Sequence, residues 1–431
     1  MKGVFARPTR GILVLYGAGD FAFNLYWQVV TLYLLFFYID VLALPPVVAG
    51  TMFMVGTLWD AAADLCAGAM VERSRGSYRG WIRWGALPLG IAFVAMFAVP
   101  PGAALWALAT QIVFRTVYAF TNVPYAGWTA RLARTARERS TVAGLRMGFG
   151  AAAGALVALF LPRLVQTTGS YAGAAALLAV AGVAVLLVMA WRVPEARSAA
   201  LATEPLAIGP ALVLLMRNRA FVALNLAAAT GGAAAALASQ SVLYFFRYVL
   251  LDELGGPRAL SGMALIGVVA VPAWTIVASV RGARWAWLAA GAMALVLPVS
   301  MALVSTPGSM AAAAFLIAMQ AAFVGFGLAA WTLLPDAIDW GEAHTGQRVE
   351  ALAYGAFAMV QKVALAGAGF AIGAIYQASG FVAGVPQGPT SLTAIRWLML
   401  AGPALLVATM LAAVLAIPPR RDTFAAQRGV D

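Results

Sequence analysis

The feature that most constrains the fold is a series of twelve apolar runs, most of them about 20 residues or longer, separated by short segments rich in Pro, Gly and Arg. A helix of about 20 apolar residues is long enough to cross the hydrocarbon core of a bilayer. The runs begin near Gly11, Pro46, Trp81, Gly102, Thr141, Tyr171, Ala220, Leu260, Trp285, Ser309, Ala351 and Leu392. We therefore expect an all-α membrane protein with twelve transmembrane helices.

The composition agrees with a membrane protein and excludes several kinds of site. The chain is 63% hydrophobic and 10% charged, which is more apolar surface than a water-soluble fold can hide. Its single cysteine, Cys66, and single histidine, His344, exclude an internal disulfide, a thiolate metal cluster and a multi-histidine metal site. We expect no cofactor and no resident metal, and we expect a monomer.

One polar stretch divides the apolar runs into two groups of six. It extends from Val193 to Asn218 and is the longest segment of polar character between runs. We expect residues 1–194 to form an N-terminal six-helix bundle and residues 219–431 to form a C-terminal six-helix bundle with a short cytoplasmic tail. Residues 195–218 would then be a cytoplasmic linker.

The basic residues predict the orientation in the membrane. With the N-terminus inside, 21 of the 28 Lys and Arg residues fall on the cytoplasmic side, which is the distribution of the positive-inside rule. Both termini are then cytoplasmic. The net charge of +12 is explained by topology and by anionic lipid, so we expect no nucleic-acid partner. The Ala- and Arg-rich, Lys-poor composition favours a bacterial inner membrane.

The second apolar run carries two carboxylates, Asp60 and Asp64, four residues apart. At roughly 100° per residue they lie on one helix face, with the hydroxyl of Thr57 one turn earlier. An ionised side chain at the centre of a membrane helix costs about 2.5–3.5 kcal/mol on insertion scales. The pair therefore indicates a water-lined path or a bound cation. The alternative is that both acids lie at the helix end in solvent.

Polar side chains line other spans at helical spacing. They are Tyr16, Asp20, Asn24 and Gln28 in the first run, Gln111, Arg115, Tyr118, Asn122 and Tyr125 in the fourth, Arg146 in the fifth and Lys362 in the eleventh. Lipid cannot solvate the ionisable ones, so they must face one another or water.

The charges of these stripes balance. Three acids, Asp20, Asp60 and Asp64, accompany three bases, Arg115, Arg146 and Lys362. This balance favours one shared cavity between the bundles, where secondary transporters bind substrate. The alternative is a set of buried ion pairs that only hold helices together. The neutral amides beside the charges favour the ligand site.

We expect substrate hydroxyls to bind amide and guanidinium groups and a substrate ring to stack on an aromatic side chain. The predicted substrate-binding residues are Asp20, Asn24, Gln28, Tyr118, Asn122, Arg146 and Trp331.

Five motifs resemble those of the glycoside–pentoside–hexuronide:cation symporters, the melibiose permease-like family of the major facilitator superfamily. They are YGAGDFAFNL at 16–25, WDAAAD at 59–64, NVPY at 122–125, PDAIDWGE at 335–342 followed by Thr345, Gly346 and Arg348, and Gln361-Lys362. The motifs occur in the order expected of that family and cover nearly the whole transport core.

The resemblance implies a twelve-helix major facilitator fold and sugar uptake by alternating access, coupled to Na⁺ or H⁺. Asp60 and Asp64 match the family's cation-binding carboxylates. Where the melibiose permeases have sugar-binding carboxylates, this chain has Asn24 and Asn122. An α-galactoside is therefore a poor match. Vertebrate relatives of this fold carry lysophospholipids, so a lysophospholipid or another amphipathic solute is the alternative substrate.

The oxygen ligands available near Asp60 and Asp64 indicate which ion is coupled to transport. Ala63 and Ala119 stand where the family has an asparagine and a hydroxyl near the cation. Sodium is a hard ion that needs several oxygen ligands, and Thr57 is the only obvious hydroxyl left on this helix. We therefore favour H⁺ over Na⁺, with Asp60, Asp64 and Thr57 in the coupling site and Lys362 as a counter-ion that competes with the proton.

The acids of the 335–342 tract suggest a gate on the cytoplasmic side. We expect Asp336, Asp339 and Glu342 to lie in a cytoplasmic loop and to form a gate network with Arg348; a solvated loop is the alternative.

A protease is a remote alternative from another class. Gly17-Ala18-Gly19-Asp20 matches the G-x-G-D of intramembrane aspartyl proteases, but the other motifs of those enzymes are missing from the expected order. We therefore expect a transporter and not an enzyme.

Overall fold

The computed structural model describes residues 9–73, 77–132, 136–195, 208–302, 308–347 and 349–418. All regular structure within these residues is helical. Contacts divide the chain into two compact units, Met1–Leu201 and Ala202–Asp431. The predicted all-α fold is confirmed.

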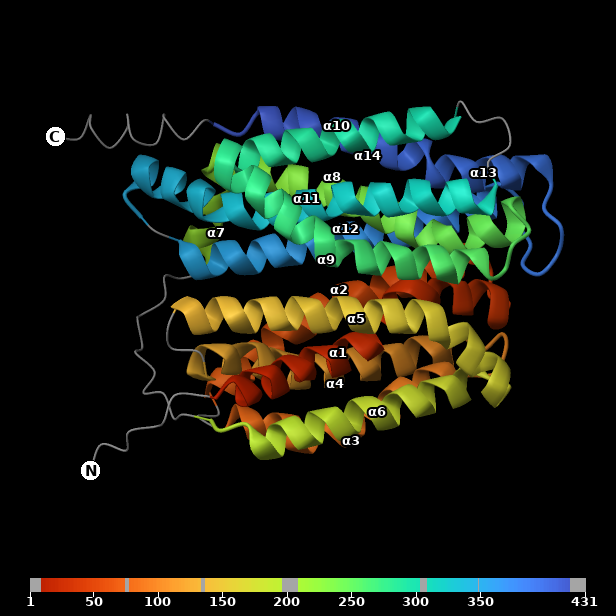
Figure 1. Ribbon diagram of the computed structural model, residues 1–431, viewed down its shortest axis with the longest axis horizontal. Coiled ribbons are helices and arrows are strands. Elements are labelled where there is room, and N and C mark those ends of the chain that lie inside the picture. Colours follow the sequence, from red (N-terminus) through yellow and green to blue (C-terminus); the bar gives the residue numbers. More distant parts are fainter. Residues whose placement is uncertain are drawn as a thin grey trace. The chain divides into compact units, whose positions relative to one another are not determined.

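The first unit contains six long helices among its described residues (Figure 1, red to yellow). They are α1 (Arg10–Phe36), α2 (Pro46–Arg73), α3 (Tyr78–Phe97), α4 (Ala104–Leu132), α5 (Ala136–Thr168) and α6 (Tyr171–Arg192). The π-helical segment η1 (Phe37–Val41) continues α1.

The second unit repeats this plan with a short helix before it and a divided last helix (Figure 1, green to blue). Its elements are α7 (Ile208–Arg217), α8 (Arg219–Tyr244), η2 (Phe245–Val249), α9 (Gly255–Arg281), α10 (Ala283–Ala302), α11 (Ser309–Thr345), α12 (Glu350–Ala378), α13 (Pro389–Met399) and α14 (Ala401–Leu415).

Eleven helical segments in the described part of the chain are long and apolar enough to cross a membrane, with α13 and α14 counted as one. The twelfth span is α4, which has 29 residues and is long enough. It carries the polar stripe of Gln111, Arg115 and Asn122. Each of the twelve spans begins within five residues of its predicted start.

The same helices pair in each unit. In the first unit α1 packs on α5 and α6, α3 packs on α4 and α6, and α2 packs on α4. In the second unit α8 packs on α12 and α14, α10 packs on α11 and α14, and α9 packs on α11. These five pairings therefore repeat between the units, whereas the extensive packing of α8 on α11 has no equal between α1 and α4.

The turn after the first helix of each unit repeats as well. In the first unit the Leu44 N–H donates to the Tyr38 carbonyl at 3.0 Å, and Ala43 between them has a φ of 52°. In the second unit Asp252 donates to the Phe246 carbonyl at 2.9 Å, and Leu251 has a φ of 57°. A positive φ is uncommon for residues with a Cβ, so its occurrence at both turns marks an internal repeat.

Side-chain caps fix where several helices begin. The side chains of Ser77, Ser170 and Asn218 each accept a hydrogen bond from a backbone N–H three residues later, at 3.0–3.2 Å. These bonds satisfy donors that the first turn of a helix leaves unpaired. The Glu195 carboxylate also accepts from the Tyr78 N–H, at 2.9 Å, and so joins the end of the first unit to the start of α3.

Two features differ from the sequence-based expectations. The stretch 195–218, predicted to be a linker, contains α7, which packs on α8, α11 and α12 of the second unit. The tract 335–342, predicted to be a loop, is helical and forms the last turns of α11. A helix can continue beyond the apolar core, and its charged end then reads as a loop in the sequence.

Candidate functional site

Asp20 on α1 forms the most accessible ion pair among the predicted site residues of the first unit. Its Oδ1 accepts from the Arg146 guanidinium on α5, at 2.9 Å from Nη2 and 3.0 Å from Nε. Its Oδ2 accepts from the Asn24 amide at 3.1 Å. The Asp20 side chain is 15% exposed and that of Arg146 is 27% exposed. The site therefore presents a charged, hydrogen-bonding surface that a polar ligand can reach.

Two tyrosines form the base of this site. The Tyr16 and Tyr125 rings stack with centroids 4.8 Å apart, and the Arg146 guanidinium lies over the Tyr125 ring at 4.9 Å from its centroid. Thr129 joins the group, because its hydroxyl lies 2.8 Å from the Tyr16 hydroxyl and accepts from Arg146 at 3.4 Å. These contacts fix the position of the Arg146 guanidinium on the side away from Asp20.

A second ion pair lies deeper in the unit, between α2 and α4. Arg115 Nη1 lies 3.8 Å from Asp60 Oδ2, and each side chain is 1% exposed. Arg115 Nη2 also donates to the Thr57 hydroxyl at 3.2 Å. The guanidinium is flanked by two rings, with centroids 5.7 Å away at Trp27 and 6.0 Å away at Phe53.

The predicted charge balance thus takes a specific form inside the first unit. Asp20 pairs with Arg146, and Asp60 pairs with Arg115. Asp64 is half-buried one turn beyond Asp60 and lies within electrostatic range of Arg115. One guanidinium therefore faces two carboxylates of α2.

This arrangement is a poor fit to a sodium ion. Thr57 and Asp60, two of the three oxygen-bearing side chains on this face of α2, already contact Arg115. The hard metal ions require several oxygens. A second positive charge about 4 Å from the guanidinium would meet a repulsion of roughly 4 kcal/mol at an effective dielectric of 20. The donor set therefore opposes a metal cation beside Asp60.

A second buried contact lies one turn away from this pair, where Gln111 of α4 meets Tyr38 and Gly56. The Tyr38 hydroxyl donates to Gln111 Oε1 at 3.1 Å, and the Gln111 amide lies against Gly56. A Cβ at Gly56 would lie 2.2 Å from Gln111 Nε2. Glycine at this position therefore lets the two helices approach closely enough for Arg115 to reach α2.

Three other predicted residues of the first unit lie half-buried on the same helices. Gln28 is on α1, two turns beyond Asp20, and Asn122 is on α4. The Tyr118 ring lies edge-on to Phe23, with centroids 5.7 Å apart. The structure places them on elements that carry the ion pairs, and their contact with substrate stays a prediction.

The predicted residues of the second unit lie on α11 and α12. Trp331 is 46% exposed, stacks on Tyr354 with centroids 6.3 Å apart and lies edge-on to Phe357. Lys362 is half-buried on α12, two turns beyond Tyr354. An exposed indole supported by two rings is suited to stacking on an apolar ring face.

The predicted gate residues lie at the end of α11. Asp336, Asp339 and Glu342 are all half-buried on that helix, and Arg348 lies outside the described residues. A cavity of ≈ 290 Å³ is lined in part by Asp336, Arg284 and Trp340.

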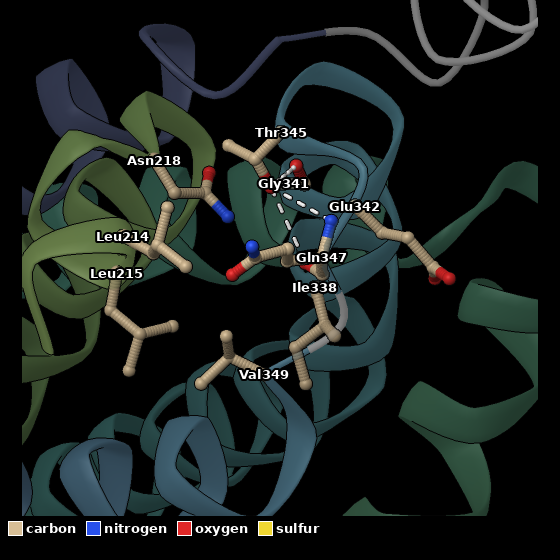
Figure 2. A pocket seen from close by; sticks show the side chains of 9 residues that line it. All are labelled: Leu214, Leu215, Asn218, Ile338, Gly341, Glu342, Thr345, Gln347 and Val349. Carbon is tan, nitrogen blue, oxygen red and sulfur yellow. Dashed lines mark hydrogen bonds between the residues drawn. The ribbon is translucent and has the colours of Figure 1, made fainter. Parts of the chain in front are cut away.

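A smaller pocket lies between α7 and α11, beside the start of α8 (Figure 2). The Asn218 amide donates to the Ala337 carbonyl at 2.8 Å, and a Cβ at Gly341 would lie 2.4 Å from that amide. Glu342 extends away from Asn218 in Figure 2. The volume of ≈ 20 Å³ has room for about one water molecule, so this pocket is too small for a solute.

Some members of the two clusters are not among the predicted site residues. Thr129 lies four residues after Tyr125 and continues the helical stripe of α4, so the same spacing could have identified it. Trp27 and Phe53 beside Arg115 carry no comparable signal, because single aromatic residues are common in membrane helices.

Comparison with known proteins adds the family. The family model described as MFS/sugar transport protein matches residues 15–418. YagG of Escherichia coli (strain K12), named as a glycoside/cation symporter, is 29% identical over 92% of this chain and 89% of its own length. The isoprimeverose transporter of Lactiplantibacillus pentosus is 26% identical over 88% of this chain and 83% of its own length.

Solved structures agree on the fold. A variant of the nucleoside transporter NupG has a TM-score of 0.71 at 14% identity, covering 93% of this chain and 99% of that one. A bacterial homolog of the human lysosomal transporter Spinster has a TM-score of 0.69 at 14% identity, covering 98% of each chain.

These proteins are membrane transporters and not enzymes. The structure also pairs Asp20, the acid of the G-x-G-D match, with the guanidinium of Arg146. The resemblance to the glycoside–pentoside–hexuronide:cation symporters is confirmed, and the chain is a multi-pass membrane transporter that belongs to the MFS/sugar transport protein family.

Proposed function

We propose that this protein carries a sugar or glycoside across the bacterial inner membrane by alternating access, in symport with one proton. The names of the relatives support the substrate class, since they include a glycoside/cation symporter and an isoprimeverose transporter. The concentration of basic residues in the segments expected to be cytoplasmic supports an orientation with both termini inside.

The observation that carries the proposal is the difference between the two ion pairs. The Asp20–Arg146 pair is 15% and 27% exposed, whereas the Asp60–Arg115 pair is 1% exposed on both sides. A substrate can reach only a pair that is partly open. The accessible pair is therefore suited to hydrogen-bonding sugar hydroxyls, and the sealed pair keeps Arg115 fixed on the α2 face to which we assign coupling.

The substrate side follows from the groups around Asp20. A carboxylate, a guanidinium and the Asn24 amide offer both acceptors and donors within one site, which is what a polyhydroxylated solute requires. The Tyr118 ring supplies a face for the apolar side of a sugar ring, and Gln28 and Asn122 supply further amides. Trp331 is the candidate stacking residue of the second unit.

The choice of a proton as the coupling ion follows from the two carboxylates of α2. Asp60 and Asp64 are two carboxylates four residues apart on one helix face. Two neighbouring carboxylates disfavour a second ionised form, and a single proton relieves their mutual repulsion. We propose that Asp64 carries this proton while Asp60 stays paired with Arg115, and that Lys362 and the acids of α11 act in the gating steps.

The test is substrate-induced proton movement in proteoliposomes, with a screen of sugars, glycosides and uronates in NaCl and in choline chloride. One substrate should make the external medium more alkaline, equally in both salts. Asp64→Asn should abolish uphill accumulation and keep substrate exchange, and Arg146→Lys should raise KM about tenfold or more, because a charged hydrogen bond is worth about 1.5–3 kcal/mol.

Asp252→Asn is the matched control for Asp64→Asn, because it replaces a carboxylate in the turn before α9 and should keep coupled uptake. Accumulation that survives in Asp64→Asn would remove that carboxylate from the coupling site. Active protein that moves no sugar, glycoside or uronate would overturn the substrate class and favour an amphipathic solute such as a lysophospholipid.

A further inference from the structure

The carboxylate face of α2 already holds a positive charge that belongs to the chain. The Arg115 guanidinium hydrogen-bonds Thr57 at 3.2 Å and pairs with Asp60 at 3.8 Å. Both contacts are on the face that also carries Asp64. A metal ion bound to these carboxylates would lie beside this fixed positive charge, so the guanidinium and a free cation compete for the same negatively charged face.

Arg115 has little freedom to leave this position. Its side chain is 1% exposed, and the rings of Trp27 and Phe53 flank the guanidinium. An arginine cannot escape the competition by losing its proton, because its guanidinium stays charged in proteins. The positive charge at Asp60 is therefore permanent in the described conformation.

The hydrogen bonding of Arg115 is incomplete. Its Nε and Nη1 are buried and have no hydrogen-bond partner among the described residues. The guanidinium is therefore held mainly by charge and by its flanking rings. A smaller neutral residue in its place would open space beside Asp60 that water and a small cation could enter.

We propose that Arg115 is a tethered cation that takes the place of a metal ion at the α2 carboxylates and makes the protein independent of Na⁺. Arg115 is then the residue that determines ion selectivity, and its replacement by a neutral side chain turns the site into a Na⁺ site. The inference rests on the proposed function in one respect, namely that the α2 carboxylates form the coupling site.

The test is Na⁺ binding to purified protein without substrate, measured as the thermal unfolding midpoint in increasing NaCl against equal concentrations of choline chloride. A ligand that binds only the folded state raises the midpoint in a saturable way. Wild type and Arg115→Lys should respond equally to the two salts. Arg115→Gln, which removes the charge and adds an amide oxygen, should show a saturable rise specific to NaCl.

The control is the double variant Asp60→Asn with Arg115→Gln, which should lose that rise because the carboxylate ligand is gone. A saturable Na⁺-specific rise in wild type would overturn the inference. So would the absence of any rise in folded, monodisperse Arg115→Gln. Arg115→Ala provides a second neutral variant if Arg115→Gln does not survive purification. In either case the wild-type titration tests whether the protein is independent of Na⁺.

This assay uses no sugar, so its outcome is separate from that of the transport screen. If no sugar is carried but Arg115→Gln gains Na⁺ binding, the proposed substrate fails and the selectivity role stands. If a sugar is carried with a proton and the neutral variants gain no Na⁺ binding, only the selectivity role fails.

Discussion

The Tyr16 hydroxyl donates to the Tyr125 carbonyl, and the Tyr125 hydroxyl donates to the Tyr16 carbonyl at 2.8 Å. The two residues thus bind each other's backbone reciprocally while their rings stack. This exchange joins α1 to α4 directly beneath the Asp20–Arg146 pair.

The reciprocal bonds predict an order of stability for two variants. Tyr125→Phe removes one hydroxyl contact and should cost about 1 kcal/mol. Tyr16→Phe should cost more, because its hydroxyl also contacts Thr129. Thermal unfolding of the purified variants in detergent measures both. Equal midpoints, or the reverse order, would contradict the proposed network.

The Asp60–Arg115 pair predicts that two substitutions are less harmful than one. Asp60→Asn leaves the buried guanidinium without its counter-ion, a change that costs about 3–5 kcal/mol in buried pairs. Adding Arg115→Met removes the uncompensated charge and should recover most of the lost thermal stability. A double variant as unstable as the sum of both single variants would show that the charges do not interact.

The contact of the Tyr125 ring with the α1 backbone predicts intolerance of a single methyl group. A Cβ at Gly19 would lie 2.7 Å from the Tyr125 ring, so Gly19→Ala should cost about 1–3 kcal/mol through overpacking. Gly148→Ala is the matched control, since a Cβ there meets no atom within 4 Å. Thermal unfolding should separate the two variants clearly, and equal midpoints would contradict the close packing of the Tyr125 ring on α1.

The environment of Asp252, in the turn before α9, predicts that its contribution to thermal stability depends on pH. A hydrogen bond from the Ser309 side chain and one from the Gly255 N–H at 2.8 Å lower the pKa of the Asp252 carboxyl. Because the pKa is lowered on folding, the stabilisation is present above the unfolded value of about 3.9 and is lost as the pH falls below it. The difference in unfolding midpoint between wild type and Asp252→Asn should therefore be constant from pH 7 to 5 and shrink below about pH 4. A difference that does not change with pH would show that the carboxylate charge plays no part.

The twelve spans could be predicted because a membrane helix must be apolar over a fixed length, and Pro, Gly and Arg mark its ends. The charge partners could not be predicted. Three acids and three bases allow several pairings, and only the packing of α2 on α4 selects Arg115 for Asp60. The spacing of residues along the sequence shows which of them share a face of one helix, but it does not show which helices are in contact.

Two local features are not evident from the sequence, for physical reasons. The helix α7 has ten residues with polar neighbours, which are too few for a span. The acids at the end of α11 interrupt the apolar pattern and so predict a loop, although carboxylates do not end a helix that extends into water.

The matching turns after α1 and α8 lie 208 residues apart (Phe245 against Phe37, Leu251 against Ala43). Their five-residue π segments, FYIDV and FFRYV, share only the first and last letters, and α9 has no ionisable residue between Arg258 and Arg281 to correspond to the carboxylates of α2. The two units therefore share a backbone plan without sharing its chemistry at this place. The helix that carries two carboxylates in the first unit is matched in the second by a helix that serves packing alone over its central turns.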